Sequence, residues 1–332
     1  MPPAPKSRPA FPSPAAVLPG EADILAKVIE NLADHDAKLV YADWLEERDD
    51  PRGPMLREFI TAYRGGKKKL PKVSAAPKSW RDLVGITLMM RIRETALGPV
   101  ADQLLGVAKP AIAFRTVKAP ESLIWSGTSK VGGKPDLLPD AKWPKFQGMP
   151  LAFHVQINLA EVAVSPVCRD LPASGMLSFF YDSWGSPSRD MRGGGRVIFT
   201  PKFKYLKGLY MPDGPEHQVR HNAGRVVFTE TVTLPALDSP WLGKSNFASD
   251  PEVEAAYRVL PDPGEPGHRL LGHSIPIAGA PPEKQTDCHL LRLGSDPIPG
   301  FGWGAGKALY FLISKGNLQK QRFNLARFEV SH

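Results

Sequence analysis

The chain has 332 residues, of which 42% are hydrophobic and 23% charged, which excludes a wholly disordered protein and allows one sizeable core plus a smaller unit. Its two cysteines cannot form the disulfide framework of a small secreted domain, and its apolar runs are shorter than the roughly 20 residues of a transmembrane helix. We therefore expect a cytoplasmic protein without a membrane segment, whose net charge of +8 favours polyanionic partners only if the basic residues are concentrated in one place.

Residues 1–20 are rich in proline, and the prolines interrupt any apolar stretch that could serve as a secretory signal. We expect this segment to be a disordered arm. Residues 65–78 carry several lysines among glycines and prolines, which is typical of a solvated basic linker. The linker could contact nucleic acid, but its lack of aromatic residues for stacking on bases makes that the weaker interpretation.

Residues 21–64 place apolar side chains at helical spacing and predict three short helices around a small apolar centre. The run from Leu39 to Glu47 reads Leu-Val-Tyr-Ala-Asp-Trp-Leu-Glu-Glu, and an Asp-Pro turn and an Arg-Glu-Phe-Ile helix follow it. This pattern resembles the repeat-companion domain, a short N-terminal module attached to many unrelated domains. The resemblance implies a module that is not known to be catalytic.

Residues 79–110 return to helical spacing and predict a helical bridge, whereas residues 111–332 contain short apolar runs separated by glycine and proline. These runs predict a β-rich domain that is roll-like and mainly antiparallel, so that the whole chain belongs to the α+β class. The glycine-proline turn at Gly133 precedes a strand at 151–159, and a similar turn at Gly272 precedes a strand at 288–293. This similarity indicates that the β-rich domain contains two related halves.

Separate motifs follow one another along this domain: Ser126 to Asp136, Trp143-Pro144, Leu151 to Leu159, Leu171 to Asp182, His268 to Gly272, Leu290 to Leu293, Phe301 to Gly304, and Tyr310 to Ile313. Their order resembles the YwqG-like family of bacterial proteins, a family without an established activity. The sequence departs from the family pattern where Ala305 replaces an aspartate and Arg292 replaces a glutamine. These changes alter a ligand if the lost groups line a pocket, and only local stability if they cap turns.

Catalytic and metal-binding motifs are incomplete. Gly133-Lys134 is followed by proline instead of the hydroxyl residue of a phosphate-binding loop, so we interpret it as a turn in which glycine supplies positive φ. His217 and His221 would share one face of a helix and could bind zinc, but the flanking glycines and prolines indicate a loop. We therefore predict no catalytic residues, no metal and no cofactor.

The remaining candidate is a polar sheet face. Alternation along the predicted strand at 151–159 puts His154 and Gln156 on the side opposite the apolar residues. We expect His268, Arg292 and Trp303 to join them as candidate ligand or interaction residues. A solvent-exposed sheet face without a ligand explains the same pattern.

The leading hypothesis from the sequence is a non-enzymatic binding protein with a protein partner. One alternative is a small-ligand sensor or enzyme that uses the face of His154 and Gln156, and another is nucleic-acid contact through the basic linker.

Overall fold

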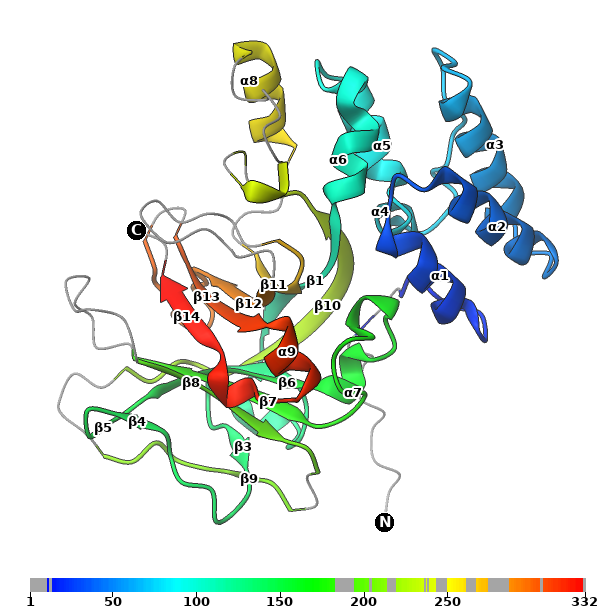
Figure 1. Ribbon diagram of the computed structural model, residues 1–332. Coiled ribbons are helices and arrows are strands. Elements are labelled where there is room, and N and C mark those ends of the chain that lie inside the picture. The colour runs from blue at the N-terminus through cyan, green and yellow to red at the C-terminus, as the bar shows by residue number, and fades with distance from the viewer. Residues whose placement is uncertain are drawn as a thin grey trace.

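The computed structural model describes residue 11 and residues 14–182, 194–202, 205–213, 219–235, 237, 239–242, 250–260, 267–273, 287–304 and 307–330. Within these ranges, no helix combines the length and the apolarity needed to cross a membrane. The chain is α+β, as the sequence predicts: a group of helices is followed by one large curled sheet (Figure 1).

The helices of the N-terminal third lie on one side of the curled sheet (Figure 1). The second begins where the Asp34 side chain accepts a 2.9 Å hydrogen bond from the backbone nitrogen of Ala37, as expected of an N-cap. Their apolar faces and the inside of the sheet form one continuous core. The helices are α1 (Glu21–Glu30), α2 (His35–Glu46), α3 (Arg52–Arg64), α4 (Lys78–Leu83), α5 (Ile86–Arg93) and α6 (Ala101–Val107), with a 3-10 turn η1 (Gly98–Val100) before α6.

The main sheet has ten strands in the order β14-β13-β12-β11-β1-β10-β2-β6-β7-β8, and all neighbours are antiparallel. Its two edges approach each other, because a Cβ atom on Gly195 of β8 would lie 2.5 Å from the Phe328 ring of β14. The sheet is therefore nearly closed around the core. The strands are β1 (Lys109–Lys118), β2 (Lys130–Val131), β6 (Ala152–Asn158), β7 (Met176–Tyr181), β8 (Gly195–Thr200), β10 (Gly224–Thr233), β11 (His268–Leu271), β12 (Asp287–Gly294), β13 (Ala308–Ser314) and β14 (Arg327–Val330).

Smaller elements connect these strands. Two short antiparallel pairs lie outside the main sheet: β3 (Asp136–Leu137) with β9 (Lys207–Gly208), and β4 (Lys145–Phe146) with β5 (Met149–Pro150). The helical connections are η2 (Glu121–Leu123), α7 (Leu159–Val162), η3 (Pro166–Cys168), η4 (Pro240–Leu242), α8 (Pro251–Val259), α9 (Lys315–Gln319) and η6 (Phe323–Leu325).

The sheet consists of two equivalent halves around the central pair β1 and β10. Strands β2, β6, β7 and β8 follow β10 on one side, and β11, β12, β13 and β14 follow β1 on the other. Lys130 of β2 pairs with Gln156, and Arg269 of β11 pairs with Arg292 in the same way. Both β6 and β12 contain a register shift, between Phe153 and Val155 in one and between His289 and Leu291 in the other. The two related halves expected from the sequence are thus present in the strand order and register.

The turns that suggested the repeat are also equivalent. After β2, Gly132 and Gly133 have positive φ values of 55° and 68°, and at the end of β11, Leu271 and the following Gly272 have values of 60° and 78°. The strand at 151–159 corresponds to the one at 288–293, as expected. The proline at position 276 lies outside the described residues.

Part of the proline-rich segment, which we expected to be disordered, packs against the sheet. The Phe11 ring stacks on Phe228 of β10 with a centroid distance of 5.4 Å, and Ala15 is 1% exposed. The backbone nitrogen of Ala15 donates to Glu230 of β10 at 2.5 Å. The segment is held in place because it satisfies this buried carboxylate and covers an aromatic ring of the core.

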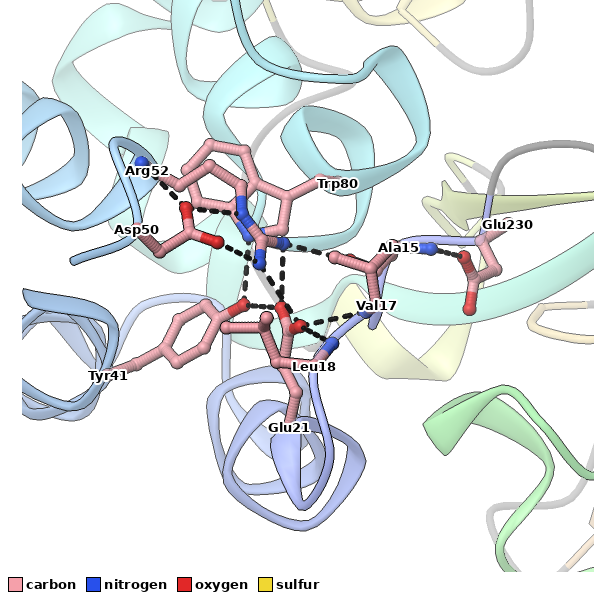
Figure 2. Close-up of polar contacts among 9 residues, drawn as sticks. All are labelled: Ala15, Val17, Leu18, Glu21, Tyr41, Asp50, Arg52, Trp80 and Glu230. Atoms are coloured by element: carbon pink, nitrogen blue, oxygen red, sulfur yellow. Dashed lines mark hydrogen bonds and ion pairs between the residues drawn. The ribbon is translucent and has the colours of Figure 1, made fainter. Parts of the chain in front are cut away.

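A second buried carboxylate, Glu21, joins the same segment to the helices (Figure 2). It accepts the backbone nitrogens of Val17 and Leu18, both at 2.8 Å, and the hydroxyl of Tyr41. The guanidinium of Arg52 lies 2.7 Å from it and also donates to the carbonyl of Ala15 at 3.1 Å. Figure 2 shows Ala15 between this network and Glu230, so the network couples the helices to the sheet.

The basic linker is exposed at Lys67, Lys68, Lys69 and Lys72 but buried at Val73 and Ala76. These two apolar residues join the common core. The lysines of the linker therefore remain in solvent while its second half is anchored.

Candidate functional site

A pocket of about 200 Å³ opens beside the turn that follows β2. Among the residues that the structure describes, those that line the pocket come from η2 and from loops and strands between β2 and β10, in the first half of the sheet. They are Glu121, Gly133, Lys134, Trp143, Phe153, Tyr210, Met211, Val219, Arg220 and His221.

The glycines of the turn are required by close backbone contacts. A Cβ atom on Gly132 would lie 2.0 Å from the carbonyl oxygen of Asn222, and one on Gly133 would lie 2.6 Å from the Glu121 carboxylate. The nitrogen of Gly132 donates to the carbonyl of His154 at 2.7 Å, and that of Gly133 donates to the carbonyl of His221 at 2.9 Å. The predicted turn with positive φ is confirmed. It brings the end of β2 into backbone contact with the segment that carries His221.

The pocket combines cations with aromatic surfaces. The ammonium group of Lys134 lies 3.8 Å from the centre of the Tyr210 ring, and a hydrogen bond to Tyr210 raises the pKa of this lysine. The backbone nitrogen of Lys134 donates to Glu121 at 2.5 Å, which fixes that carboxylate in the wall. Arg220 pairs loosely with Asp213 at 3.7 Å. The pocket thus offers two cations and the indole of Trp143 to a ligand.

Two histidines meet at the wall of the pocket, where His221 lines the pocket and His154 lies next to His221. The Nε2 atoms of His154 and His221 are 3.2 Å apart, and Nδ1 of His154 lies 3.1 Å from the carbonyl oxygen of Ala152. Burial lowers the pKa of His154 well below its usual value, and that of His221 to about 4. Both rings are therefore neutral at neutral pH.

Aromatic rings enclose His154. Trp303 stacks on it with a centroid distance of 5.5 Å, and Phe301 lies at 5.2 Å. Phe301 also contacts His221 at 4.7 Å and His268 at 5.9 Å. Three candidates from the sequence, His154, Trp303 and His268, thus gather around Phe301, which belongs to one of the family motifs but was not among the candidate residues.

Gln156 lies elsewhere, because the register shift at His154 breaks the alternation along β6. The expectation that these two residues share one polar face does not hold. Gln156 donates to Asp136 at 2.7 Å and accepts from the backbone nitrogen of Asp136 at 2.8 Å. Lys130 also donates to Asp136 at 3.0 Å, and all three side chains are buried. Gln156 therefore anchors β3.

The other two candidates are also buried in the second half of the sheet. His268 bonds to Asp296 at 2.9 Å and stacks on Phe114. Arg292 donates to the carbonyl of Gly267 at 2.8 Å and is the residue equivalent to Gln156. The structure thus brings together His154, Trp303 and His268 but not Gln156 and Arg292. Ala305 and His217 lie outside the described residues.

The pocket residues Glu121, Tyr210 and Arg220 were missed from the sequence. Glu121 lies in the short helix η2, the other two lie in loops, and none belongs to a motif with a known chemistry. The pair Gly133-Lys134 could have indicated the pocket in the sequence, because it marks a tight turn that carries a cation.

The fold and the site together define an α+β domain with a nearly closed antiparallel sheet and a pocket at one set of loops. Residues 129–331 match the family described as Domain of unknown function (DUF1963), and the chain belongs to this family. The match includes the pocket from Gly133 onward and leaves the N-terminal helices unassigned. No curated protein matches the chain.

Proposed function

We propose that the β-rich domain is a non-enzymatic binding domain that holds a small planar ligand with an anionic group in the pocket beside Lys134. The observation that carries this proposal is the pairing of Lys134 with the Tyr210 ring at 3.8 Å, next to Arg220 and Trp143 in one concave site. The ammonium and guanidinium groups would bind a carboxylate or phosphate, and the rings would cover a planar body.

The buried environment of Cys168 supports a binding function over nucleophilic catalysis. Cys168, which precedes Arg169-Asp170, is 2% exposed, and burial raises the pKa of its thiol. A thiol in this environment stays protonated at neutral pH and is a poor nucleophile. Cys168 is a free thiol, which fits the cytoplasmic location that we propose.

We also propose that the two sequence resemblances describe the parts of the chain more finely than the family match. The motifs from Ser126 onward support a YwqG-like domain, and those between Leu39 and Ile60 support a repeat-companion module. Neither resemblance supplies an activity, so the pocket remains the basis of the functional proposal.

The test is a thermal-shift screen of the full chain with aromatic carboxylates and mononucleotides at millimolar concentration. We expect at least one compound to raise the Tm of the wild type but not that of Lys134→Ala or Tyr210→Ala. Lys145→Ala removes an exposed lysine of β4 that does not line the pocket, and it should respond as the wild type does. A screen without any stabilising compound, or equal stabilisation of Lys134→Ala, contradicts the proposal.

A protein partner is the second candidate, and exposed apolar side chains next to the pocket favour it. Leu123 is 66% and Trp125 is 45% exposed, and both follow the pocket residue Glu121. The experiment compares complexes captured by the wild type and by the Leu123→Ser/Trp125→Ser variant. Leu325→Ser, at another exposed leucine, is the matched control. Identical complexes from all three chains would exclude this surface as the contact.

A further inference from the structure

Exposed lysines border the pocket next to its aromatic walls. Lys142 immediately precedes Trp143, and its side chain is exposed. Lys207 is also exposed and lies in β9, where a Cβ atom on the adjacent Gly208 would approach the Lys134 side chain to 3.5 Å. Lys142 and Lys207 do not line the pocket, so they extend its positive charge onto the surrounding surface.

The two aromatic walls of the pocket differ in exposure. The indole of Trp143 is fixed, because its Nε1 donates to the carbonyl of Leu151 at 2.9 Å and its ring meets Phe180 edge to face at 5.5 Å between centroids. Tyr210 is 72% exposed, although the ammonium group of Lys134 lies over its ring. One ring is thus a fixed wall, and the other is an open platform on which a planar group can stack.

The pocket is small for an entire ligand. Its volume of about 200 Å³ lies below the range of about 300–1,000 Å³ for sites that enclose a drug-sized molecule. A ligand larger than one ring system would therefore extend across the exposed surface, where Arg220, Lys142 and Lys207 lie. Asp213 contacts Arg220 at 3.7 Å, but its carboxylate is fully exposed, so a phosphate group can replace it at little cost.

We propose that this surface binds single-stranded nucleic acid, with one base in the pocket and the flanking phosphates on Lys134, Arg220 and the two bordering lysines. Because the pocket would hold one unit of the strand, this proposal rests on the proposed function of the pocket. A duplex fits less well, because its bases are stacked inside the helix and cannot reach Tyr210. The net charge of +8 favours a polyanion, and the aromatic rings that the basic linker lacks lie beside the cations here.

The experiment measures the binding of fluorescently labelled oligothymidylate and oligouridylate, each of about 12 nucleotides, to the full chain by anisotropy. Unlabelled dTMP and UMP are the competitors. We expect the better 12-mer to bind at least about tenfold more tightly than its mononucleotide at the same salt concentration, because several phosphates are then engaged. It should also bind more tightly than a duplex of equal length. The tighter of the two strands identifies the natural ligand as DNA or RNA.

Lys142→Ala/Lys207→Ala is the informative variant, because it removes two exposed lysines outside the pocket. It should reduce the slope of log K against log salt by about 1.4, at about 0.7 for each phosphate contact. Tyr210→Leu keeps an apolar side chain without the ring and should weaken 12-mer binding at least about fivefold.

Lys68→Ala/Lys69→Ala is the matched control, because it removes the same charge from the exposed linker. Figure 1 shows β9 at the end of the molecule away from α3 and α4, between which the linker lies. This control should bind the 12-mer as the wild type does. Circular dichroism should show that all variants are folded.

Equal affinity for the strand and its mononucleotide, or for the strand and the duplex, overturns the proposal. A linker variant that loses as much salt dependence as Lys142→Ala/Lys207→Ala also overturns it, since the linker would then be the contact. In each case the proposed function of the pocket is judged separately. It stands if a mononucleotide or an aromatic carboxylate stabilises the wild type but not Lys134→Ala.

Discussion

Phe179 of β7 and Phe311 of β13 occupy equivalent positions in the two halves of the sheet, and their rings meet edge to face with centroids 5.0 Å apart. Each is paired with the residue that follows the register shift of the neighbouring strand, Val155 in one half and Leu291 in the other. The two halves therefore touch through the same residue of each, at the centre of the core.

Truncation of either ring should destabilise the whole protein. We expect Phe179→Ala and Phe311→Ala each to lower the free energy of unfolding by about 3–5 kcal/mol, because both side chains are fully buried. A double-mutant cycle measured by urea denaturation should give a coupling of about 0.5–1.5 kcal/mol for the edge-to-face contact. Strictly additive effects would show that the rings do not interact.

The losses of stability caused by substituting Glu21 and Arg52 should not add, because the second substitution is expected to offset part of the first. Arg52→Met leaves a buried carboxylate without its cation, and we expect a loss of about 3–5 kcal/mol. The double variant Glu21→Gln/Arg52→Met should be more stable than Arg52→Met alone. Arg57→Met, which removes a more exposed ion pair with Glu46, should cost less than about 1 kcal/mol. A double variant that is less stable than Arg52→Met would contradict this account.

Substitutions at two glycines separate a steric clash from backbone strain. Gly132 and Gly148 have φ values of 55° and 83°, but a Cβ atom meets Asn222 at 2.0 Å only at Gly132 and nothing within 4 Å at Gly148. We expect Gly148→Ala to cost about 1–2 kcal/mol and Gly132→Ala clearly more. Urea denaturation measures both, and equal costs would mean that the turn can move away from Asn222.

His273 should make the protein sensitive to acid. Burial, with a smaller effect of Lys109, lowers its pKa from 6.5 to about 3 in the folded state, and its ring bonds to the carbonyl of Val107 at 2.7 Å. Below pH 6.5 the unfolded chain binds a proton that the folded chain does not, so this stability is present above pH 6.5 and is lost toward pH 3.

Each pH unit in this window costs about 1.4 kcal/mol. The variant His273→Gln keeps a donor for Val107 and removes the titration. Its stability relative to the wild type should improve by about 2 kcal/mol between pH 7 and pH 5, measured by urea denaturation. An unchanged difference between the two proteins would show that His273 titrates normally.

The sequence predicted the features that depend on neighbouring residues. Helical periodicity located the helices, glycine and proline located the turns, and the similarity around Gly133 and Gly272 indicated the two halves. It could not predict the face of His154, because a single extra residue in β6 reverses the alternation and leaves no local mark. The contact between His154 and His221 depends on the pairing of strands distant in the chain, which periodicity does not encode.

The packing of Phe11 and Ala15 against the sheet escaped prediction for a related reason. Proline-rich composition favours disorder when a segment is considered alone. Here Ala15 supplies a hydrogen-bond donor to Glu230, which is 0% exposed, and Phe11 covers Phe228. The residues that this segment contacts, Phe228 and Glu230, lie more than two hundred positions away in the chain, so local sequence patterns do not predict the contacts.

Strand β1 lies in the middle of the sheet, between β10 and β11, yet it precedes residue 129, where the family match begins. A fragment cut at that boundary would lose its central strand and expose the hydrogen-bonding edges of both neighbours. Such a fragment would pair with other copies of itself before it folded, and the smallest autonomous piece of this protein must include residues 109–118.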